Sequence, residues 1–177
     1  FHNFFDDKLE VSVEGYYKLM NNLVEYRDGF DPDQNINNNP DNNFVFGKGD
    51  SYGAEFFIRK NGAKFNGWIG YTLSWTNRVF PDLNNGNPFP ARYDRRHDLS
   101  VVGSYRISKR WSVSAVFVYG SGGAMTVPAS RYFINGNIVT EYGDRNSFRM
   151  PDYHRLDLGA TLYPNPKKKK RFKSTWN

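Results

Sequence analysis

Apolar and polar residues alternate along several stretches of this chain with a period of two. In RWSVSAVFVYG (110–120), Trp111, Ala115 and Tyr119 fall on one side of an extended strand, and Ser112 and Ser114 fall on the other. The same alternation occurs in segments 8–26, 51–60, 65–77, 98–107 and 153–163. No residue on the apolar side of these segments is charged. In the first segment this holds as far as Leu19, and in the second as far as Ile58. The pattern predicts an all-β antiparallel meander of about six strands, with a seventh starting at Ser174.

The connections between these strands alternate in length, which distinguishes between kinds of β protein. The long ones span 27–50, 78–97 and 122–152, and the short ones span 61–64, 108–110 and 164–173. The long ones are rich in Asn, Gly, Pro and Asp, whereas Asn61-Gly62 is typical of a tight hairpin. Outer-membrane β-barrels combine long extracellular loops with short periplasmic turns. We therefore predict that 1–177 is a partial transmembrane β-barrel domain in the cell outer membrane, with its long loops extracellular and its short turns periplasmic.

Large aromatic residues occur near both ends of the apolar face. Tyr52, Trp75 and Tyr119 lie toward the long loops, and Phe65, Tyr105 and Trp111 lie toward the short turns. Two aromatic girdles around an aliphatic band are typical of the two interfaces of a membrane, so we expect this face to contact lipid. A soluble sheet packed on a core also alternates and stays an alternative. About eight strands are needed to close a transmembrane barrel, so we expect a piece of a larger one.

Composition limits the alternatives further. Aromatic residues make up 18% of the 177 residues and charged residues 24%, and no run approaches the roughly 18 apolar residues of a transmembrane helix. The absence of cysteine excludes disulfide scaffolds and thiolate metal sites. Much of the net charge of +6 comes from KKKKRFK (167–173), and no nucleic-acid-binding motif accompanies it. We expect no nucleic-acid partner; in the last short turn these lysines contact lipid headgroups or stay solvated.

Three stretches resemble a known family. They are GKGDSYGAEFFIRKNGAKFNGWIGYTLSWTNR (47–78), PARYDRRHDLSVVGSYRISKRWSVSAVFVYGSG (90–122) and RMPDYHRLDLGATL (149–162). Their motifs GxxxSYGxExFxRK, YDRRHDLS and PxYxRLDLG resemble the C-terminal barrel region of TonB-dependent receptors. These motifs identify a barrel region better than they identify a substrate.

The resemblance implies a barrel of about 22 strands, closed by the receptor's own N-terminal plug domain. It also implies import of a scarce small nutrient (an iron chelate, cobalamin, a glycan or a peptide) with energy from the TonB complex of the inner membrane. No segment here resembles the plug domain, the TonB box or the terminal strand, so we expect the penultimate part of the barrel. A passive porin or a structural outer-membrane barrel stays the alternative function, and a soluble β-sheet binding module is a third.

Ligand-binding residues are expected in the long loops, the surfaces open to an external solute besides the lumen. Aromatic rings offer stacking area, and arginine offers forked donors to carboxylates, phosphates or sugar hydroxyls. A hairpin around Asn135-Gly136, within 131–142, is expected to reach over the pore mouth. The candidates are Phe80, Phe89, Arg92, Tyr93, Arg95, Arg96, Arg131 and Tyr132. Alternatively these loops pack on each other, with Arg95 and Arg96 paired to Asp94 and Asp98.

Nothing in the sequence indicates catalysis or a resident metal. The histidines His2, His97 and His154 are scattered, and no nucleophile–base pair follows from spacing, so we expect no enzyme, no catalytic residue and no cofactor. His97 lies in a charged cluster that is either a ligand or metal site or a salt-bridged barrel rim. DPDQNIN (31–37) begins like a calcium loop, but Ile36 and Asn42 stand where glycine and glutamate are required.

Overall fold

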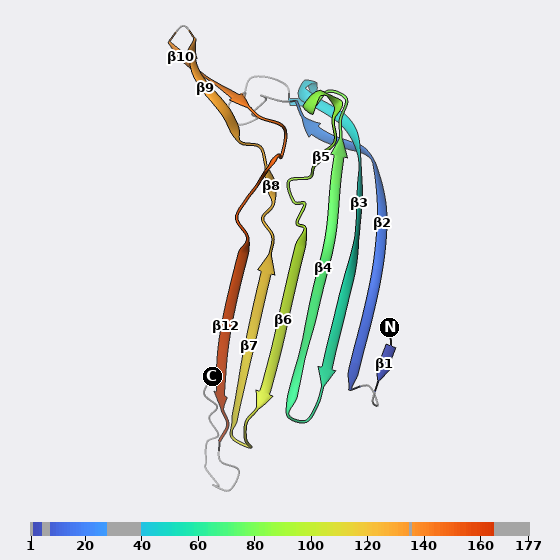
Figure 1. The fold of residues 1–177 in the computed structure, drawn as a ribbon, viewed down its shortest axis with the longest axis vertical. Coiled ribbons are helices and arrows are strands. Elements are labelled where there is room, and N and C mark those ends of the chain that lie inside the picture. Colours follow the sequence, from blue (N-terminus) through green and yellow to red (C-terminus); the bar gives the residue numbers. More distant parts are fainter. Residues whose placement is uncertain (1, 5–7, 28–39, 135, 165–177) are drawn as a thin grey trace.

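The computed structural model describes residues 2–4, 8–27, 40–134 and 136–164, and it is nearly all β. The main sheet has the order β1-β2-β3-β4-β6-β7-β12, and all neighbouring strands are antiparallel (Figure 1). Its strands are β1 (His2–Phe4), β2 (Leu9–Tyr26), β3 (Phe44–Asn61), β4 (Phe65–Val79), β6 (His97–Arg106), β7 (Trp111–Gly120) and β12 (Tyr153–Leu162). The predicted all-β meander is confirmed.

Shorter elements occupy the long connections. The short strands are β5 (Phe89–Pro90), β8 (Ala124–Met125), β9 (Pro128–Ile134), β10 (Asn137–Tyr142) and β11 (Phe148–Arg149). Two 3-10 turns are η1 (Pro40–Asn43) and η2 (Asn84–Gly86). The strands β9 and β10 form the hairpin expected from Asn135-Gly136, where Gly136 has a φ of 82°, a value that favours glycine. The hairpin projects beyond the end of the sheet (Figure 1).

The first long loop is shorter than predicted. The segment 44–50, predicted as loop, belongs to β3 and pairs with the end of β2 and with β4. Its glycines suggested a loop, but a Cβ on Gly47 would lie 2.5 Å from the Phe80 ring, and one on Gly49 would lie 2.6 Å from the Asn77 carbonyl oxygen. Glycine is therefore required here for close packing. The calcium-like segment 31–37, nearly all of the turn 164–173 and the strand start at Ser174 lie outside the described residues.

The register keeps the two faces of the sheet separate across six strands. One row of partners runs through Ser12, Phe57, Gly70, Ser100, Val118 and Arg155. The next row, on the other face, runs through Val13, Phe56, Tyr71, Leu99, Tyr119 and His154. Side chains point alternately to the two faces along every strand, so once one pair of residues is assigned to a face, the register assigns every other residue of the sheet. The alternation in the sequence thus becomes one polar and one mainly apolar surface.

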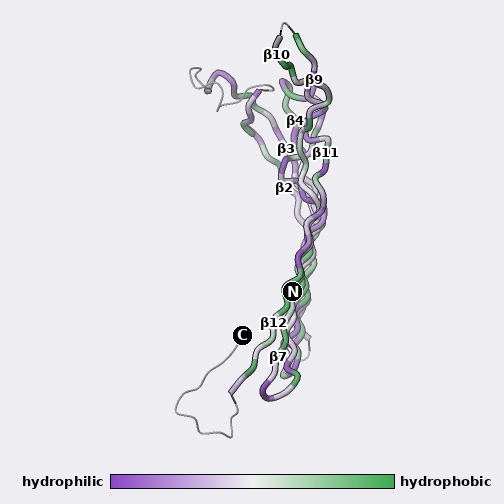
Figure 2. Tube along the Cα trace, turned by 90° about the vertical axis from the view of Figure 1, so that its left-hand side faces the viewer, coloured by the Kyte–Doolittle hydropathy of each residue, from purple (hydrophilic) through white to green (hydrophobic). Residues whose placement is uncertain are grey.

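The apolar face is exposed in the described chain. Its large side chains include Val13 (63% exposed), Ile69 (45%), Leu156 (58%) and Leu158 (76%). Viewed edge-on, the sheet is a single layer along most of its length (Figure 2). Within the described ranges, no helix is long and apolar enough to span a membrane. A face this apolar requires an apolar environment, which a bilayer supplies.

Both predicted aromatic clusters lie on this face. The rings of Tyr52 and Trp75 stack with centroids 5.3 Å apart and an interplanar angle of 12°. At the opposite end, Phe65 pairs with Tyr105 in the register, and both rings are more than 40% exposed. The aromatic rings are therefore placed where amphipathic side chains anchor a barrel at its two interfaces.

The small buried core lies under the long loops rather than against the sheet face. Val45, Phe80, Leu83 and Phe89 form a cluster in which each side chain is at most 2% exposed, and Leu23 packs against it. The rings of Phe80 and Phe89 have centroids 6.0 Å apart. This cluster fastens the loop between β4 and β6 to the upper ends of β2 and β3.

The two faces predict different responses to a buried charge. Ala115, midway between Trp111 and Tyr119 on the apolar face, should tolerate arginine poorly. We expect Ala115→Arg to lower the free energy of unfolding of the intact barrel in lipid vesicles by about 2–4 kcal/mol. Ser114→Arg, on the polar face, should cost far less. Equal losses in urea-unfolding titrations of the two variants would contradict the assignment of the faces.

Candidate functional site

The upper edge of β4 is completed by an aspartate side chain. The backbone of β4 pairs with β5 at Asn77 and Arg78 and with β6 from Phe65 to Leu73. Residues 91–96, which connect β5 to β6, make no register pair with β4. In this gap the Thr76 N–H donates to Asp94 Oδ1 at 2.7 Å. The groups on either side of this N–H make ordinary backbone hydrogen bonds: the Thr76 carbonyl accepts from the Ala91 N–H, and the Ser74 N–H donates to the Arg96 carbonyl. Asp94 therefore replaces a missing strand carbonyl.

The second oxygen of Asp94 binds two arginines. Asp94 is 2% exposed, and its Oδ2 accepts from Arg149 Nη2 and, at 3.4 Å, from Arg96 Nη2. Arg149 Nη1 donates to the Asp94 carbonyl and, at 3.5 Å, to the Gly122 carbonyl. Burying a carboxylate is costly unless it has such hydrogen-bond and ion-pair partners. Arg149 belongs to β11, so Asp94 connects the two long loops that follow β4 and β7.

Asp152, in the connection between β7 and β12, also accepts a backbone N–H and a side-chain donor. Its Oδ1 accepts the Gly122 N–H at 3.1 Å, and its Oδ2 accepts the Tyr119 hydroxyl at 2.5 Å. The bond from Tyr119, followed by that from the Gly122 backbone, lowers the pKa of Asp152 below its ordinary value. The carboxylate therefore stabilises this end of β7 in its charged form, an effect that is lost as the pH falls through the lowered pKa.

A third bridge involves Glu25 at the end of β2. Its Oε2 contacts Arg78 Nη1 at 2.9 Å, and its Oε1 contacts Arg145 Nη2 at 3.4 Å. The guanidinium of Arg78 also lies 5.3 Å from the centroid of the Tyr93 ring, and that of Arg145 lies 5.6 Å from the centroid of the Phe89 ring. One carboxylate thus connects β2, β4 and the loop before β11. Together with Asp94 and Asp152 it ties the long loops to the upper end of the sheet, which we call the rim.

The predicted ligand-binding residues fall into three groups. Phe80 and Phe89 are buried in the loop core and present no free ring surface. Arg95 Nη1 lies 3.3 Å from Asp98 Oδ2, and Arg96 is bound to Asp94 while its guanidinium lies over the Trp75 ring, so both make the pairings given as the alternative. The remaining four candidates, Arg92, Tyr93, Arg131 and Tyr132, are exposed.

The structure does not gather these four at one point. Arg92 and Tyr93 lie on the loop between β5 and β6, whereas Arg131 and Tyr132 lie on β9 in the projecting hairpin (Figure 1). Tyr93 is 63% exposed, although its hydroxyl accepts from Arg78 Nη2 at 3.1 Å. They form two separate patches at the same end of the sheet.

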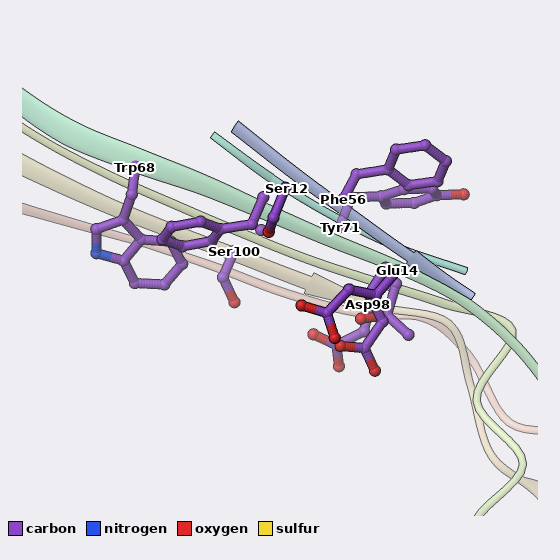
Figure 3. A pocket seen from close by; sticks show the side chains of 11 residues that line it. Ser12, Glu14, Phe56, Trp68, Tyr71, Asp98 and Ser100 are labelled. Atoms are coloured by element: carbon purple, nitrogen blue, oxygen red, sulfur yellow. The ribbon is translucent and has the colours of Figure 1, made fainter. Parts of the chain in front are cut away.

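The polar face carries a shallow hollow that the sequence analysis missed. Its volume is about 380 Å³. Glu14 lies opposite Glu55 in the register, Glu55 opposite Thr72, and Thr72 opposite Asp98. Figure 3 shows the Glu14 and Asp98 carboxylates on the side of the sheet opposite the Phe56 and Tyr71 rings. The sequence did place both glutamates on the polar side, since they alternate with apolar residues. That they lie opposite each other depends on the strand register, which the sequence pattern does not give.

A neighbouring aromatic pair forms one wall of this hollow. The rings of Phe57 and Trp68 have centroids 6.0 Å apart, and Ser12 beside them is 8% exposed. The hollow therefore combines carboxylates with an apolar wall. In the described part of the chain, no group of three or more acidic, histidine or cysteine side chains is arranged to hold a metal ion. His97 Nδ1 is instead 2.8 Å from the Tyr71 hydroxyl.

Removing the charge of Asp94 should loosen the rim. Asp94→Asn keeps an oxygen for the Thr76 N–H but leaves Arg149 and Arg96 without their shared carboxylate. We expect the free energy of unfolding of the intact protein, measured by urea titration in lipid vesicles, to fall by about 2–3 kcal/mol. Asp82→Asn, at an exposed aspartate of the same loop, is the matched control and should stay within about 0.5 kcal/mol. A small loss for Asp94→Asn would show that the rim does not depend on this carboxylate.

Comparison with known proteins agrees with this architecture. The family model for the β-barrel of TonB-dependent receptor-like proteins matches residues 2–175. No curated protein and no solved structure matches the chain. The match covers nearly the whole chain and agrees with the open antiparallel sheet as part of a barrel wall. The chain therefore belongs to the TonB-dependent receptor β-barrel family, whose members are outer-membrane receptors that act in transport and are not enzymes.

Proposed function

We propose that this chain forms part of the barrel wall and the extracellular rim of a receptor that imports a scarce small nutrient with energy from the TonB complex. The observation that supports this most is the cross-linked rim. Three carboxylates, Glu25, Asp94 and Asp152, hold the long loops on the sheet edge. A binding surface on loops requires such support, because a ligand selects a loop geometry only when the loops are held in place.

The orientation of the barrel follows from the lengths of its connections. The connections after β4 and β7 lie at one end of the sheet, together with the end of β2 and the start of β3, and the short turns after β3 and β6 lie at the other (Figure 1). Bacterial barrels place their long loops outside the cell and their short turns in the periplasm. On this basis the rim faces the medium, where a nutrient first meets the receptor.

The ligand-contacting set is narrower than the sequence alone indicated. We assign first contacts to Arg92, Tyr93, Arg131 and Tyr132, because their side chains are exposed. Phe80 and Phe89 support these residues from the buried loop core. Exposed arginines offer forked donors and exposed tyrosines offer stacking surface, which suits a ligand with carboxylate, phosphate or hydroxyl groups. Iron chelates, cobalamin, glycans and peptides all present such groups.

The polar face suits a cationic protein partner within the barrel. Glu14 and Glu55 are direct neighbours across β2 and β3, and like charges in such positions repel each other. A lysine or arginine seated between them removes this penalty, and the Phe57–Trp68 wall offers it apolar packing. We assign this surface to the receptor's own N-terminal plug domain. The bilayer is the partner of the opposite face.

The hairpin gives a direct test of nutrient import. Deleting residues 131–142 from the full-length receptor removes Arg131 and Tyr132 without touching the main sheet. We expect ligand affinity and uptake by whole cells to fall by roughly tenfold or more, given that such contacts contribute above 1 kcal/mol each, while the amount of folded barrel in the outer membrane stays unchanged. Unchanged uptake would contradict the role of the hairpin. Uptake that persists after a protonophore collapses the inner-membrane gradient would favour a passive pore.

Cysteine labelling tests the orientation independently. The chain has no native cysteine, so single substitutions report their own positions. Asp82→Cys lies in the loop between β4 and β6, and Ala63→Cys lies in the short turn after β3, both at exposed residues. We expect a membrane-impermeant maleimide to label Asp82→Cys on intact cells and Ala63→Cys only after the outer membrane is permeabilised. The reverse labelling pattern would show that the barrel has the opposite orientation in the membrane.

A further inference from the structure

Positive charge is concentrated at the short-turn end of the sheet. The ranges 8–11, 57–68, 103–113 and 159–164 form this end, and their only carboxylate is Glu10. Their cations are Lys8, Arg59, Lys60, Lys64, Arg106, Lys109 and Arg110. All seven are exposed. We refer to these seven residues as the cationic turn end.

None of these seven side chains makes an ion pair within the described part of the chain. The ion pairs of the long-loop end involve Arg78, Arg95, Arg96, Arg145 and Arg149. The two ends of the sheet therefore differ in kind. At the long-loop end five arginines are paired with carboxylates, whereas in the described part of the chain none of the seven cations at the turn end is paired, so an external partner can bind them together.

Exposed aromatic residues are the chain neighbours of three of these cations. Lys64 precedes Phe65, Arg106 follows Tyr105, and Arg110 precedes Trp111. The three rings are 43–46% exposed. Successive residues of a strand are about 3.3 Å apart and point to opposite faces, so each of these three cations starts on the polar side of the strand end, one residue from a ring of the girdle. Rings at the level of lipid headgroups with adjacent cations are the pattern that a membrane interface selects.

Lys60 indicates on which side the partner lies. It pairs with Leu9 and Gly67 in the register and so belongs to the apolar face. An ammonium on that face is stable only if its four-carbon stem runs along apolar surface while its charge reaches the headgroup layer. Gly67, which lies opposite Lys60, has no side chain. The Phe65 ring lies 3.3 Å from the position that a Cβ on Gly67 would take. The partner of this charge is therefore a component of the membrane.

We propose that the cationic turn end binds the phosphate groups of anionic glycerophospholipids of the surrounding leaflet. Seven exposed cations that make no ion pair within the described ranges, with Lys60 on the lipid-facing side next to an aromatic girdle, match a layer of negative phosphates above hydrocarbon. A soluble acidic protein or a nucleic acid would match the charge but not the exposed rings on the lipid-facing side. This lipid site depends on the membrane-facing sheet and is independent of which nutrient is imported.

The test compares lipid selectivity at the two ends of the barrel. The full-length receptor is reconstituted in nanodiscs of phosphatidylcholine, and spin-labelled phosphatidylglycerol and phosphatidylcholine report the lipid held at the protein surface. We expect the wild-type receptor to favour phosphatidylglycerol, and Lys64→Gln/Lys109→Gln to reduce that preference roughly two- to fivefold. High salt should reduce the wild-type preference in the same direction, because exposed charges are screened.

The matched control removes two exposed cations from the opposite end. Arg27→Gln/Lys48→Gln changes the net charge by the same amount and should leave the preference unchanged. Equal selectivity for both lipids in the wild-type receptor, or equal losses in the two double variants, would overturn the proposal. Because the measurement contains no nutrient, failure of the lipid site and failure of nutrient import are distinguishable.

Discussion

The structure depends on the parity of its antiparallel register. Each strand places alternate side chains on opposite faces, so a slip of one residue between two neighbours would move every apolar side chain of one strand to the polar side. The observed register keeps Val13, Phe56, Tyr71 and Leu99 on one face from β2 to β6. Both the lipid-facing surface and the polar surface with its carboxylates follow from that single constraint. No second layer is needed, because the bilayer takes the place of a core.

The upper edge of the sheet poses a different problem. Where a strand loses its neighbouring strand, its backbone N–H groups lose their partners, and burying them unpaired is costly. Asp94 and Asp152 solve this by offering carboxylate oxygens to Thr76 and Gly122. Each carboxylate then recruits a second group, an arginine or a tyrosine hydroxyl, from another element. The same interactions that complete the edge of the sheet thereby hold the loops above it in place.

Several parts of the site could be predicted from local pattern. The alternation around Trp111 and Tyr119 indicated the faces, and Asn135-Gly136 indicated the hairpin of β9 and β10. Other parts could not. Phe80 and Phe89 have the residue type of ligand-contacting rings, yet they pack on each other beneath the loop. Glycines at 47 and 49 resembled a loop, yet they give β3 the close contacts it needs. Burial depends on residues distant in the sequence, which a local pattern does not contain.

The sequence by itself determined the strands, the two faces, the alternation of long and short connections and the family resemblance, because these depend on residue type and on a spacing of two. Tertiary structure alone decided which distant charges meet. Asp94 and Arg149 are 55 residues apart in the chain, and Glu25 and Arg78 are 53 apart. It also aligned Glu14 with Glu55 and left the turn-end cations without ion pairs within the described chain. The physical reason is that register and loop packing, which bring distant residues together, follow from the summed contacts of the whole sheet.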